Sequence, residues 1–305
     1  MSGRRRVVTT VLVLISLPMM AAIIGAVSFY SHAGTTHSFE SSGLKREYVL
    51  YVPRTYNSSK AAPLVISLHA AGLWHAAQME MSGWNDLADK RGFIVVYPSA
   101  VQTGISVWNV NEDPGPAGDV RFIAELIDSL KLKYNVDSTR IYANGMSNGG
   151  GMSFVLSCAL SDRIAAVGLV GSAQTLRWDW CRDTKPVPVI AIHGTADPVV
   201  PYGGGRSWIS PRNFPGIVGW MKSWAQRNGC DVQAKSSVVT NDVVKHAYPH
   251  CRNDAEVVLY EVKGGGHTWP GGEPLPEWFV GKTSTSIDAT REMWDFFSAH
   301  PLNHD

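Results

Sequence analysis

The sequence predicts an α/β fold, with a mostly parallel central sheet and helices on both of its faces. Short runs of apolar and β-branched residues alternate with helix-length segments, the pattern of successive strand and helix units. The run from Leu64 to Leu68 is apolar almost throughout, as is typical of a strand buried on both faces. A chain of 305 residues without an evident linker or repeat is long enough for one large domain with a sizeable core.

The expected elements follow in order along the chain. Strands are expected at residues 48–52, 64–68, 93–97, 140–143, 165–170, 189–192 and 257–262, where Val, Ile, Leu and Tyr concentrate. Helices are expected at residues 78–91, 120–134, 150–160, 217–227 and 287–300. Two stretches rich in Gly, Trp and Pro, residues 101–116 and 201–215, come after strand ends. Because loops at strand ends build the sites of such folds, these stretches are candidate pocket walls.

Residues 1–34 differ from the rest of the chain. Arginines at 4–6 precede an uncharged apolar run over 7–30, which predicts an export segment. Small residues before Gly34 favour a signal peptide cleaved after Ala33, whereas the length of the run also suits a retained single-span anchor. Both alternatives place residues 35–305, a single domain, outside the cytoplasm, with membrane contact only through the N-terminal segment.

The charge balance argues against nucleic acid as a partner. The chain has 27 Lys and Arg against 26 Asp and Glu, a formal net charge of +1. No long basic run occurs beyond the N-terminus, and nucleic-acid binding ordinarily needs such a run or a basic patch. The oligomeric state is left open by the sequence.

The cysteines also indicate export. The chain has 4 of them, Cys158, Cys181, Cys230 and Cys251, and none is in a C-x-x-C arrangement that would suggest a metal site or redox catalysis. We therefore expect no metal ion and two disulfides. Four cysteines allow three pairings, of which Cys158 with Cys181 and Cys230 with Cys251 joins nearest neighbours. Buried free thiols are the alternative.

A short glycine-rich motif is the strongest indication of chemistry. Gly145-Met146-Ser147-Asn148-Gly149 lies between an expected strand and an expected helix. G-x-S-x-G in this context is typical of a nucleophile elbow, a turn so tight that only glycine fits beside the serine, whose hydroxyl is left exposed. The alternative is a glycine-rich turn with an ordinary serine, so further residues must support the assignment.

A serine hydroxyl becomes a good nucleophile only with a base in reach and an acid that orients the base. Asp197 follows the strand expected at 189–192, and His267 follows the strand expected at 257–262 at the end of a glycine run. The order Ser, Asp, His is that of α/β hydrolases. Because parallel strands end at the same edge of a sheet, we expect Ser147, Asp197 and His267 to meet there. His193 is expected to be structural.

Two backbone N–H groups are expected to stabilise the oxyanion that forms when the serine attacks. One belongs to Asn148, directly after the serine. The other is expected in the turn after the strand at 64–68, at Ala71, with Gly72 and Leu73 as competitors. No organic cofactor is required for this chemistry.

Three segments together resemble a known family. These are Asn144 to Gly150, His193 to Asp197, and the specific run Gly265-Gly266-His267-Thr268-Trp269-Pro270-Gly271. They resemble the secreted polyhydroxybutyrate depolymerase and feruloyl or acetylxylan esterase group of α/β hydrolases, and the likeness extends from about Arg46 to Phe297. The resemblance implies Ser147 as nucleophile, Asp197 as acid and His267 as base. It also implies an acyl-enzyme mechanism on short polyhydroxyalkanoate or cell-wall feruloyl or acetyl esters.

Two features of the site are less typical of that group. Relatives usually carry His-Gly where this chain has His69-Ala70, and alanine at a position that often prefers positive φ would be strained. Either the loop is therefore shaped differently, or the oxyanion donor lies one residue along. Trp108 and Trp269 lie in strand-exit loops, where flat apolar rings can line an acyl or sugar pocket. The alternatives to an ester hydrolase are a silent, membrane-tethered binding domain and a peptidase on the same fold.

Overall fold

The structure is a computed structural model that describes residues 36–101, 105–111, 116–174, 178–181, 185–207 and 213–302. The chain divides into two units, Met1–Thr35 and Thr36–Asp305. The export segment predicted at residues 1–34 lies outside the described residues, so signal peptide and anchor both stay predictions. Parts of the two predicted pocket loops, 102–104, 112–115 and 208–212, also lie outside them.

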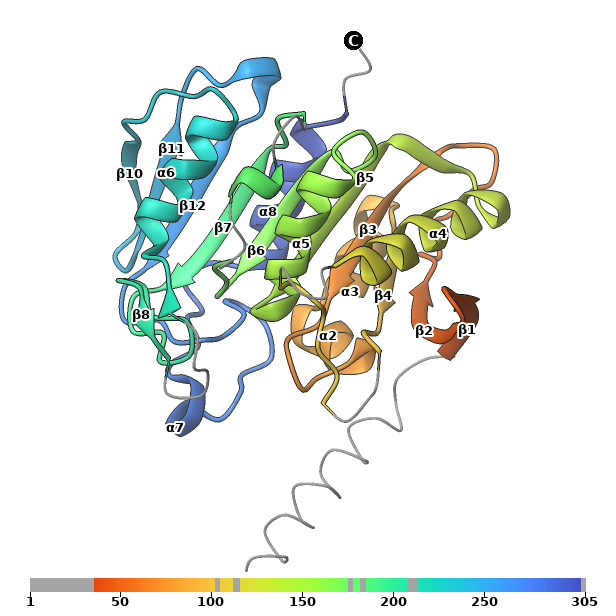
Figure 1. The fold of residues 1–305 in the computed structure, drawn as a ribbon, viewed down its shortest axis with the longest axis horizontal. Helices are drawn as coiled ribbons and strands as arrows, with labels where there is room; N and C mark the ends of the chain where they lie inside the picture. Colours follow the sequence, from red (N-terminus) through yellow and green to blue (C-terminus); the bar gives the residue numbers. More distant parts are fainter. Residues whose placement is uncertain are drawn as a thin grey trace, which may run out of the picture. The chain divides into compact units, whose positions relative to one another are not determined.

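A mostly parallel, 10-stranded sheet forms the centre of the second unit (Figure 1), in the order β1-β2-β4-β3-β5-β6-β7-β12-β11-β10. The strands are β1 Thr36–Ser41, β2 Leu44–Tyr51, β3 Ala62–Leu68, β4 Ile94–Pro98, β5 Val136–Met146, β6 Ala166–Val170, β7 Val189–Gly194, β10 Lys235–Thr240, β11 Val243–Tyr248 and β12 Val257–Val262. From β4 to β12 neighbouring strands run parallel, and antiparallel pairs close both edges. The predicted α/β fold with a mostly parallel sheet is confirmed.

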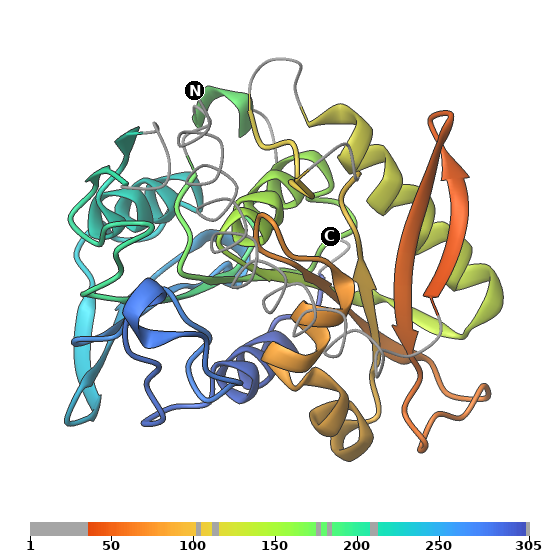
Figure 2. The ribbon, with the colours of Figure 1, turned by 90° about the horizontal axis from the view of Figure 1, so that it is seen from below.

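Helices cover both faces of this sheet. They are α2 His75–Ser82, α3 Trp84–Arg91, α4 Ala117–Lys133, α5 Asn148–Ala159, α6 Ile217–Arg227, α7 Glu277–Val280 and α8 Ala289–Ala299. Figures 1 and 2 show α4, α5 and α6 on one face and α2, α3 and α8 on the other. Two 3₁₀ turns, Trp178–Cys181 and Arg252–Asp254, and a small ribbon of β8 Gly205–Arg206 with β9 Asn213–Phe214 complete the described elements.

The structure differs from the predicted elements in two respects. The single helix predicted at 78–91 is two helices, because Gly83 between them has a left-handed φ of 64° and ends α2. The edge strands β1, β10 and β11 were not predicted. β10 is almost wholly exposed, so its sequence lacks the apolar run from which buried strands were inferred.

Aromatic side chains join α8 to the sheet. The ring of Phe297 stacks on Tyr142 of β5 at 4.9 Å and on Trp84 of α3 at 6.2 Å between centroids. Trp294 stacks on Phe93 at 4.0 Å. The other face has its own aromatic cluster, made of Phe154, Trp178, Trp220 and Trp224. Large buried rings therefore fill both layers between helices and sheet, and they fix the sheet that carries the site loops.

Both disulfides have the nearest-neighbour pairing. Cys158 bonds Cys181, and Cys230 bonds Cys251. The first ties the end of α5 to the 3₁₀ turn beyond β6, and the second ties the segment after α6 to the end of β11. Two disulfides are consistent with an oxidising, extracytoplasmic compartment. Within the described ranges, no helix has the length and apolarity to cross a membrane.

A buried ion pair links the antiparallel edge of the sheet to α4. Arg46 of β2 donates to Asp119 Oδ1 at 2.7 Å, and both side chains are almost fully buried. The guanidinium also lies over the ring of Phe122, with 3.9 Å between its carbon and the ring centroid. The second carboxylate oxygen of Asp119 accepts the backbone N–H of Asn109 at 2.8 Å. The pair therefore also holds the loop that follows β4.

Removing only one partner of this pair should be costly. We expect Arg46→Met to lower the free energy of unfolding by about 3–5 kcal/mol, because a buried carboxylate loses its counter-ion. Arg46→Met combined with Asp119→Leu should cost clearly less than the single substitution. Urea unfolding of the three proteins measures this. Equal losses in the single and double variants would contradict the ion-pair account.

Candidate active site

Ser147 lies in a strained turn between β5 and α5. Its φ of 54° and ψ of −117° are unusual for a residue other than glycine. The flanking glycines make the turn possible: a Cβ at Gly145 would lie 2.7 Å from the Leu68 carbonyl oxygen, and one at Gly149 would overlap that same oxygen. The two fixed glycines of the motif are therefore required by close backbone approach to the end of β3.

Hydrogen bonds on both sides of Ser147 hold this backbone in place. Its N–H donates to the carbonyl of Val170, at the end of β6, at 2.8 Å. Its carbonyl accepts the hydroxyl of Ser172 at 2.7 Å and the N–H of Gly151 at 3.0 Å. The strain is thus retained by the neighbouring strand, as expected of a functional turn.

Replacement of Gly149 by alanine should destabilise the protein, whereas the same replacement of Gly118, another helical glycine, should not. Gly149→Ala must displace the end of β3, and we expect a loss of at least about 3 kcal/mol of unfolding free energy. Gly118→Ala, in α4, meets no atom within 4 Å and should be neutral or stabilising by up to about 1 kcal/mol. Thermal and urea unfolding compare them. A Gly149→Ala protein as stable as the wild type would contradict the packing argument.

Asp197 and His267 form a buried hydrogen-bonded pair. The Nδ1–H of His267 donates to Asp197 Oδ2 at 2.8 Å. The other carboxylate oxygen accepts the N–H groups of Val199 and Val200, both at 2.8 Å. The carboxylate is therefore fixed by its own loop, and it fixes the tautomer and orientation of the imidazole.

A second histidine also faces Asp197. His193 Nε2 lies 2.8 Å from the Val200 carbonyl and 3.3 Å from Asp197 Oδ2, so this nitrogen carries a proton and donates to oxygens. Burial by itself would raise the pKa of Asp197, but the hydrogen bonds from His193 and His267 lower that pKa well below its ordinary value. Asp197 is therefore ionised at any pH at which the protein would work. The structural role predicted for His193 includes direct support of this carboxylate.

Gly171 connects the serine to the acid–histidine pair. It directly follows Val170, which binds the Ser147 N–H, and its φ is 52°. A Cβ at Gly171 would lie 3.0 Å from His267 Nδ1 and 3.4 Å from Asp197 Oδ2. The three residues predicted from the sequence thus gather around one short segment, where β5, β6, β7 and β12 end.

His69 holds the loop expected to supply the second backbone donor. His69 Nε2 accepts the N–H of Ala100 at 3.0 Å, so its proton is on Nδ1, which donates to the Ala70 carbonyl at 2.8 Å. The N–H and C=O of one peptide point in opposite directions. Fixing the Ala70 carbonyl therefore turns the Ala71 N–H away from His69.

The two competing donors in this loop already have partners. The N–H of Gly72 donates to the Ser106 carbonyl at 2.9 Å, and that of Leu73 to the Ala70 carbonyl at 3.1 Å. Ala71 itself lines the cavity beside Ser147. The strain expected at Ala70 or Ala71 does not occur, because the positive φ of the loop, 76°, falls on Gly72. The loop is shaped differently from the expectation, and alanine fits it.

Acid should destabilise the protein through His69. Burial lowers the pKa of His69 from 6.5 to about 4, although its bond to Ala70 opposes this. As the pH falls, the His69 side chain is protonated in the unfolded chain before it is protonated in the folded protein. The free energy of unfolding, which is fully present above pH 6.5, therefore falls by about 3 kcal/mol towards pH 4. Urea unfolding across this range measures the loss.

A non-titrating replacement is the control. His69→Gln should show a shallower fall in unfolding free energy between pH 6.5 and pH 4, whereas substitution of the exposed His37 by Gln should keep the wild-type profile. If the slope of the His69→Gln profile equals that of the wild type, His69 is not the responsible group.

A small, mainly apolar cavity lies beside Ser147. Its volume is about 250 Å³. Its lining consists of Ala71, Val107, Val110, Ser147, Asn148, Gly151, Ala173, Gln174, Val199, Val200 and Phe214. The described parts of both predicted pocket loops thus contribute, through Val107, Val110 and Phe214.

The side chain of Asn148 fixes one wall of this cavity. Its Oδ1 accepts the backbone N–H of Trp108 at 2.7 Å, and its Nδ2 donates to the Trp108 carbonyl at 3.1 Å. Val107 and Val110, on either side of this clamp, face the cavity. Asn148 therefore positions the wall of this cavity as well as starting α5.

The prediction that Trp108 and Trp269 line the pocket needs correction. Their exposed fractions are 0% and 1%. The indole N–H of Trp108 donates to the His69 carbonyl at 3.1 Å, behind the oxyanion loop, and that of Trp269 donates to Thr290 Oγ1 at 3.0 Å. Since both rings have their polar atom satisfied inside the protein, they support the site from the core.

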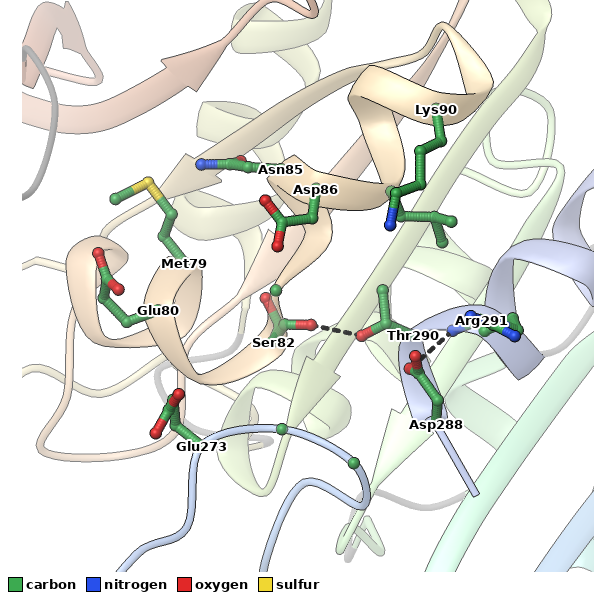
Figure 3. A pocket seen from close by; sticks show the side chains of 14 residues that line it. Met79, Glu80, Ser82, Asn85, Asp86, Lys90, Glu273, Asp288, Thr290 and Arg291 are labelled. Carbon is green, nitrogen blue, oxygen red and sulfur yellow. Dashed lines mark hydrogen bonds between the residues drawn. The ribbon is translucent and has the colours of Figure 1, made fainter. Parts of the chain in front are cut away.

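A larger cavity lies elsewhere. It measures about 480 Å³ and lies between α2, α3, residues 271–273 and the start of α8, and its lining is polar, with the carboxylates Glu80, Asp86, Glu273 and Asp288 beside Lys90 and Arg291 (Figure 3). It contains none of Ser147, Asp197 and His267. Over the described part of the chain, no group of three or more His, Cys, Asp or Glu is arranged to hold a metal ion. Size alone therefore does not identify the site.

Sequence reasoning missed Gly171 and Ser172. Both follow the strand expected at 165–170, next to the elbow strand, so their position at a sheet edge was a usable signal. Their residue types gave none, because Gly-Ser is common in any loop.

The chain is similar to known esterases. The family described as Esterase PHB depolymerase matches residues 46–176. Feruloyl esterase B of Piromyces equi is 33% identical over 234 residues, which cover 73% of this chain and 42% of that protein. A bifunctional acetylxylan esterase/xylanase of Neocallimastix patriciarum is 26% identical, over 84% of this chain and 33% of that protein.

A solved structure supports the fold independently. An acetyl xylan esterase from Aspergillus awamori superimposes with a TM-score of 0.63 at 16% identity, over 87% of this chain and 99% of that one. The chain spans less than half the length of the two curated relatives above.

Proposed function

We propose that this chain, which belongs to the esterase PHB depolymerase family over residues 46–176, is an exported serine hydrolase of carboxylic esters. The observation that carries the proposal is the 2.8 Å hydrogen bond between His267 and Asp197, close to the strained backbone of Ser147. The order Ser, Asp, His at the ends of β5, β7 and β12 is that of α/β hydrolases. The Gly-Gly-His-Thr-Trp-Pro-Gly run adds the likeness to esterases.

In the proposed reaction Ser147 Oγ attacks the ester carbonyl. Because His267 Nδ1 donates to Asp197, the other ring nitrogen, Nε2, is left to take the serine proton. The ionised Asp197 stabilises the imidazolium that results. The N–H groups of Asn148 and Ala71 are the proposed donors to the oxyanion.

Three further proton transfers complete the cycle. His267 returns its proton to the leaving alcohol, which departs and leaves the acyl group on Ser147. His267 then removes a proton from water, the hydroxide attacks the acyl-enzyme, and the acid product leaves with Ser147 reprotonated. No cofactor takes part in these steps.

The proposed substrates are feruloyl or acetyl esters of cell-wall carbohydrate. The names of the relatives support this class. Short polyhydroxyalkanoate esters are the second substrate class, and a panel of methyl ferulate, acetylated xylan and hydroxybutyrate oligomers distinguishes them.

A silent binding domain and a peptidase are the rival functions. A silent hydrolase-like domain usually lacks a member of the triad, and this chain has all three residues. Labelling by a fluorophosphonate probe at Ser147 supports the enzyme, and a folded protein that stays unlabelled supports the binding domain. Hydrolysis of peptide but not ester substrates would favour the peptidase. N-terminal sequencing of the exported protein tests cleavage after Ala33.

Loss of the Ser147 hydroxyl should abolish activity without unfolding the protein. We expect Ser147→Ala to lower kcat for p-nitrophenyl acetate by roughly 10⁴- to 10⁶-fold, and thermal unfolding should change little. Ser298→Ala, an exposed serine of α8, is the matched control and should keep full activity. Retained activity in Ser147→Ala would reject the assigned nucleophile.

A further inference from the structure

An exposed aromatic pair lies on α7, beyond the edge of the sheet where β7 and β12 end (Figures 1 and 2). Trp278 is 88% exposed and Phe279 39% exposed. Their rings meet edge to face, with centroids 5.6 Å apart. A tryptophan ordinarily buries a large part of its apolar surface, so one that is held in solvent beside an active site indicates a contact surface.

The pair is rigidly attached to the loop of the proposed base. The N–H of His267 donates to the carbonyl of Val280, the last residue of α7, at 2.6 Å. The N–H of Gly266 donates to the Lys282 carbonyl at 2.8 Å. Gly266 is in backbone contact with Gly281, and Val280 is buried. The position of Trp278 is therefore fixed relative to His267.

The proposed reaction assigns the two halves of the ester to different sides. The acyl carbonyl must face the N–H groups of Asn148 and Ala71, so the acyl group enters the cavity that these residues line. The leaving oxygen must lie at His267, which protonates it. The alcohol half therefore extends past His267, on whose backbone α7 packs.

We infer that Trp278 and Phe279 form a subsite for a sugar ring in the alcohol half of a carbohydrate ester, an inference that rests on the proposed function. The apolar face of a pyranose can lie on an exposed indole. Glu277, directly before the pair, and Lys282, three residues after it, are both exposed and can bond sugar hydroxyls. A polyester chain or lipid tails carry no hydroxyl groups for these charges, so the mixed chemistry favours a carbohydrate.

Kinetics on two esters of the same acid test the subsite. For a feruloylated xylan or arabinoxylan oligosaccharide, Trp278→Ala should raise KM roughly five- to tenfold and leave kcat unchanged, because the ring binds substrate remote from the reacting bond. KM and kcat for methyl ferulate, whose alcohol is too small to reach α7, should stay at wild-type values. Leu132→Ala, which removes an 89% exposed side chain on α4, is the matched control. It should leave KM and kcat for both substrates at their wild-type values.

Two results would overturn the subsite. One is an unchanged KM for the oligosaccharide ester in Trp278→Ala. The other is an equal rise for both esters, which would mean that the substitution disturbs the His267 loop. Loss of binding to phosphatidylcholine vesicles or to hydroxybutyrate polymer in Trp278→Ala, with oligosaccharide KM unchanged, would assign the pair to that surface instead.

A binding measurement separates failure of the subsite from failure of the proposed function. Calorimetric titration of Ser147→Ala with unesterified xylo-oligosaccharide needs no catalysis, and Trp278→Ala in that background should weaken the binding by a similar factor. Binding that depends on Trp278, together with a wild-type protein that hydrolyses none of the esters, would retain the subsite and reject the reaction. Esterase activity of the wild type on methyl ferulate, without oligosaccharide binding, would retain the reaction and reject the subsite.

Discussion

The close approach of the elbow to the end of β3 is the constraint on which the rest of the site depends. Gly149 touches the Leu68 carbonyl so closely that no side chain fits between them. This contact brings the start of α5, with the Asn148 N–H, against the strand that leads into His69 and Ala71. Asn148 and Ala71, from segments far apart in the sequence, thus line one cavity with Ser147, where their N–H groups are the proposed oxyanion donors. The cost is a strained Ser147, held by hydrogen bonds to the end of β6.

Around this contact, buried polar groups hold the loops in place. The Arg46–Asp119 pair fixes Asn109, and Asn148 fixes the neighbouring Trp108 by two hydrogen bonds. Neutral His69 fixes the Ala70 peptide. Burying any of these polar groups without a hydrogen-bond partner would cost free energy, and each has a partner. The loops are therefore held in the positions that keep these hydrogen bonds. A preorganised oxyanion site needs this rigidity, because its donors must not reorganise during the reaction.

The acid and base are arranged by the same means. Asp197 accepts hydrogen bonds from two backbone N–H groups of its own loop and from one ring N–H of each of two histidines, which keeps the carboxylate ionised although it is buried. His267 is held on its backbone by α7 and on its ring by Asp197. The element that positions the base therefore also presents Trp278 to solvent. The proposed base and the proposed subsite therefore lie in one short stretch of chain.

The sequence by itself determined the α/β class and the candidates Ser147, Asp197 and His267, because buried strands, tight glycine turns and the triad order follow from local composition and spacing. It left three disulfide pairings open, and the structure selects Cys158 with Cys181 and Cys230 with Cys251. Side-chain burial, loop conformation and the neighbours of the elbow depend on long-range contacts, so only the tertiary structure decided them. In the structure Trp108 and Trp269 lie in the core, and the positive φ of the loop after β3 is at Gly72. Gly171 and Ser172 lie against the elbow. The physical reason is that burial and hydrogen-bond partners of a loop residue depend on segments tens of residues away, which no local pattern specifies.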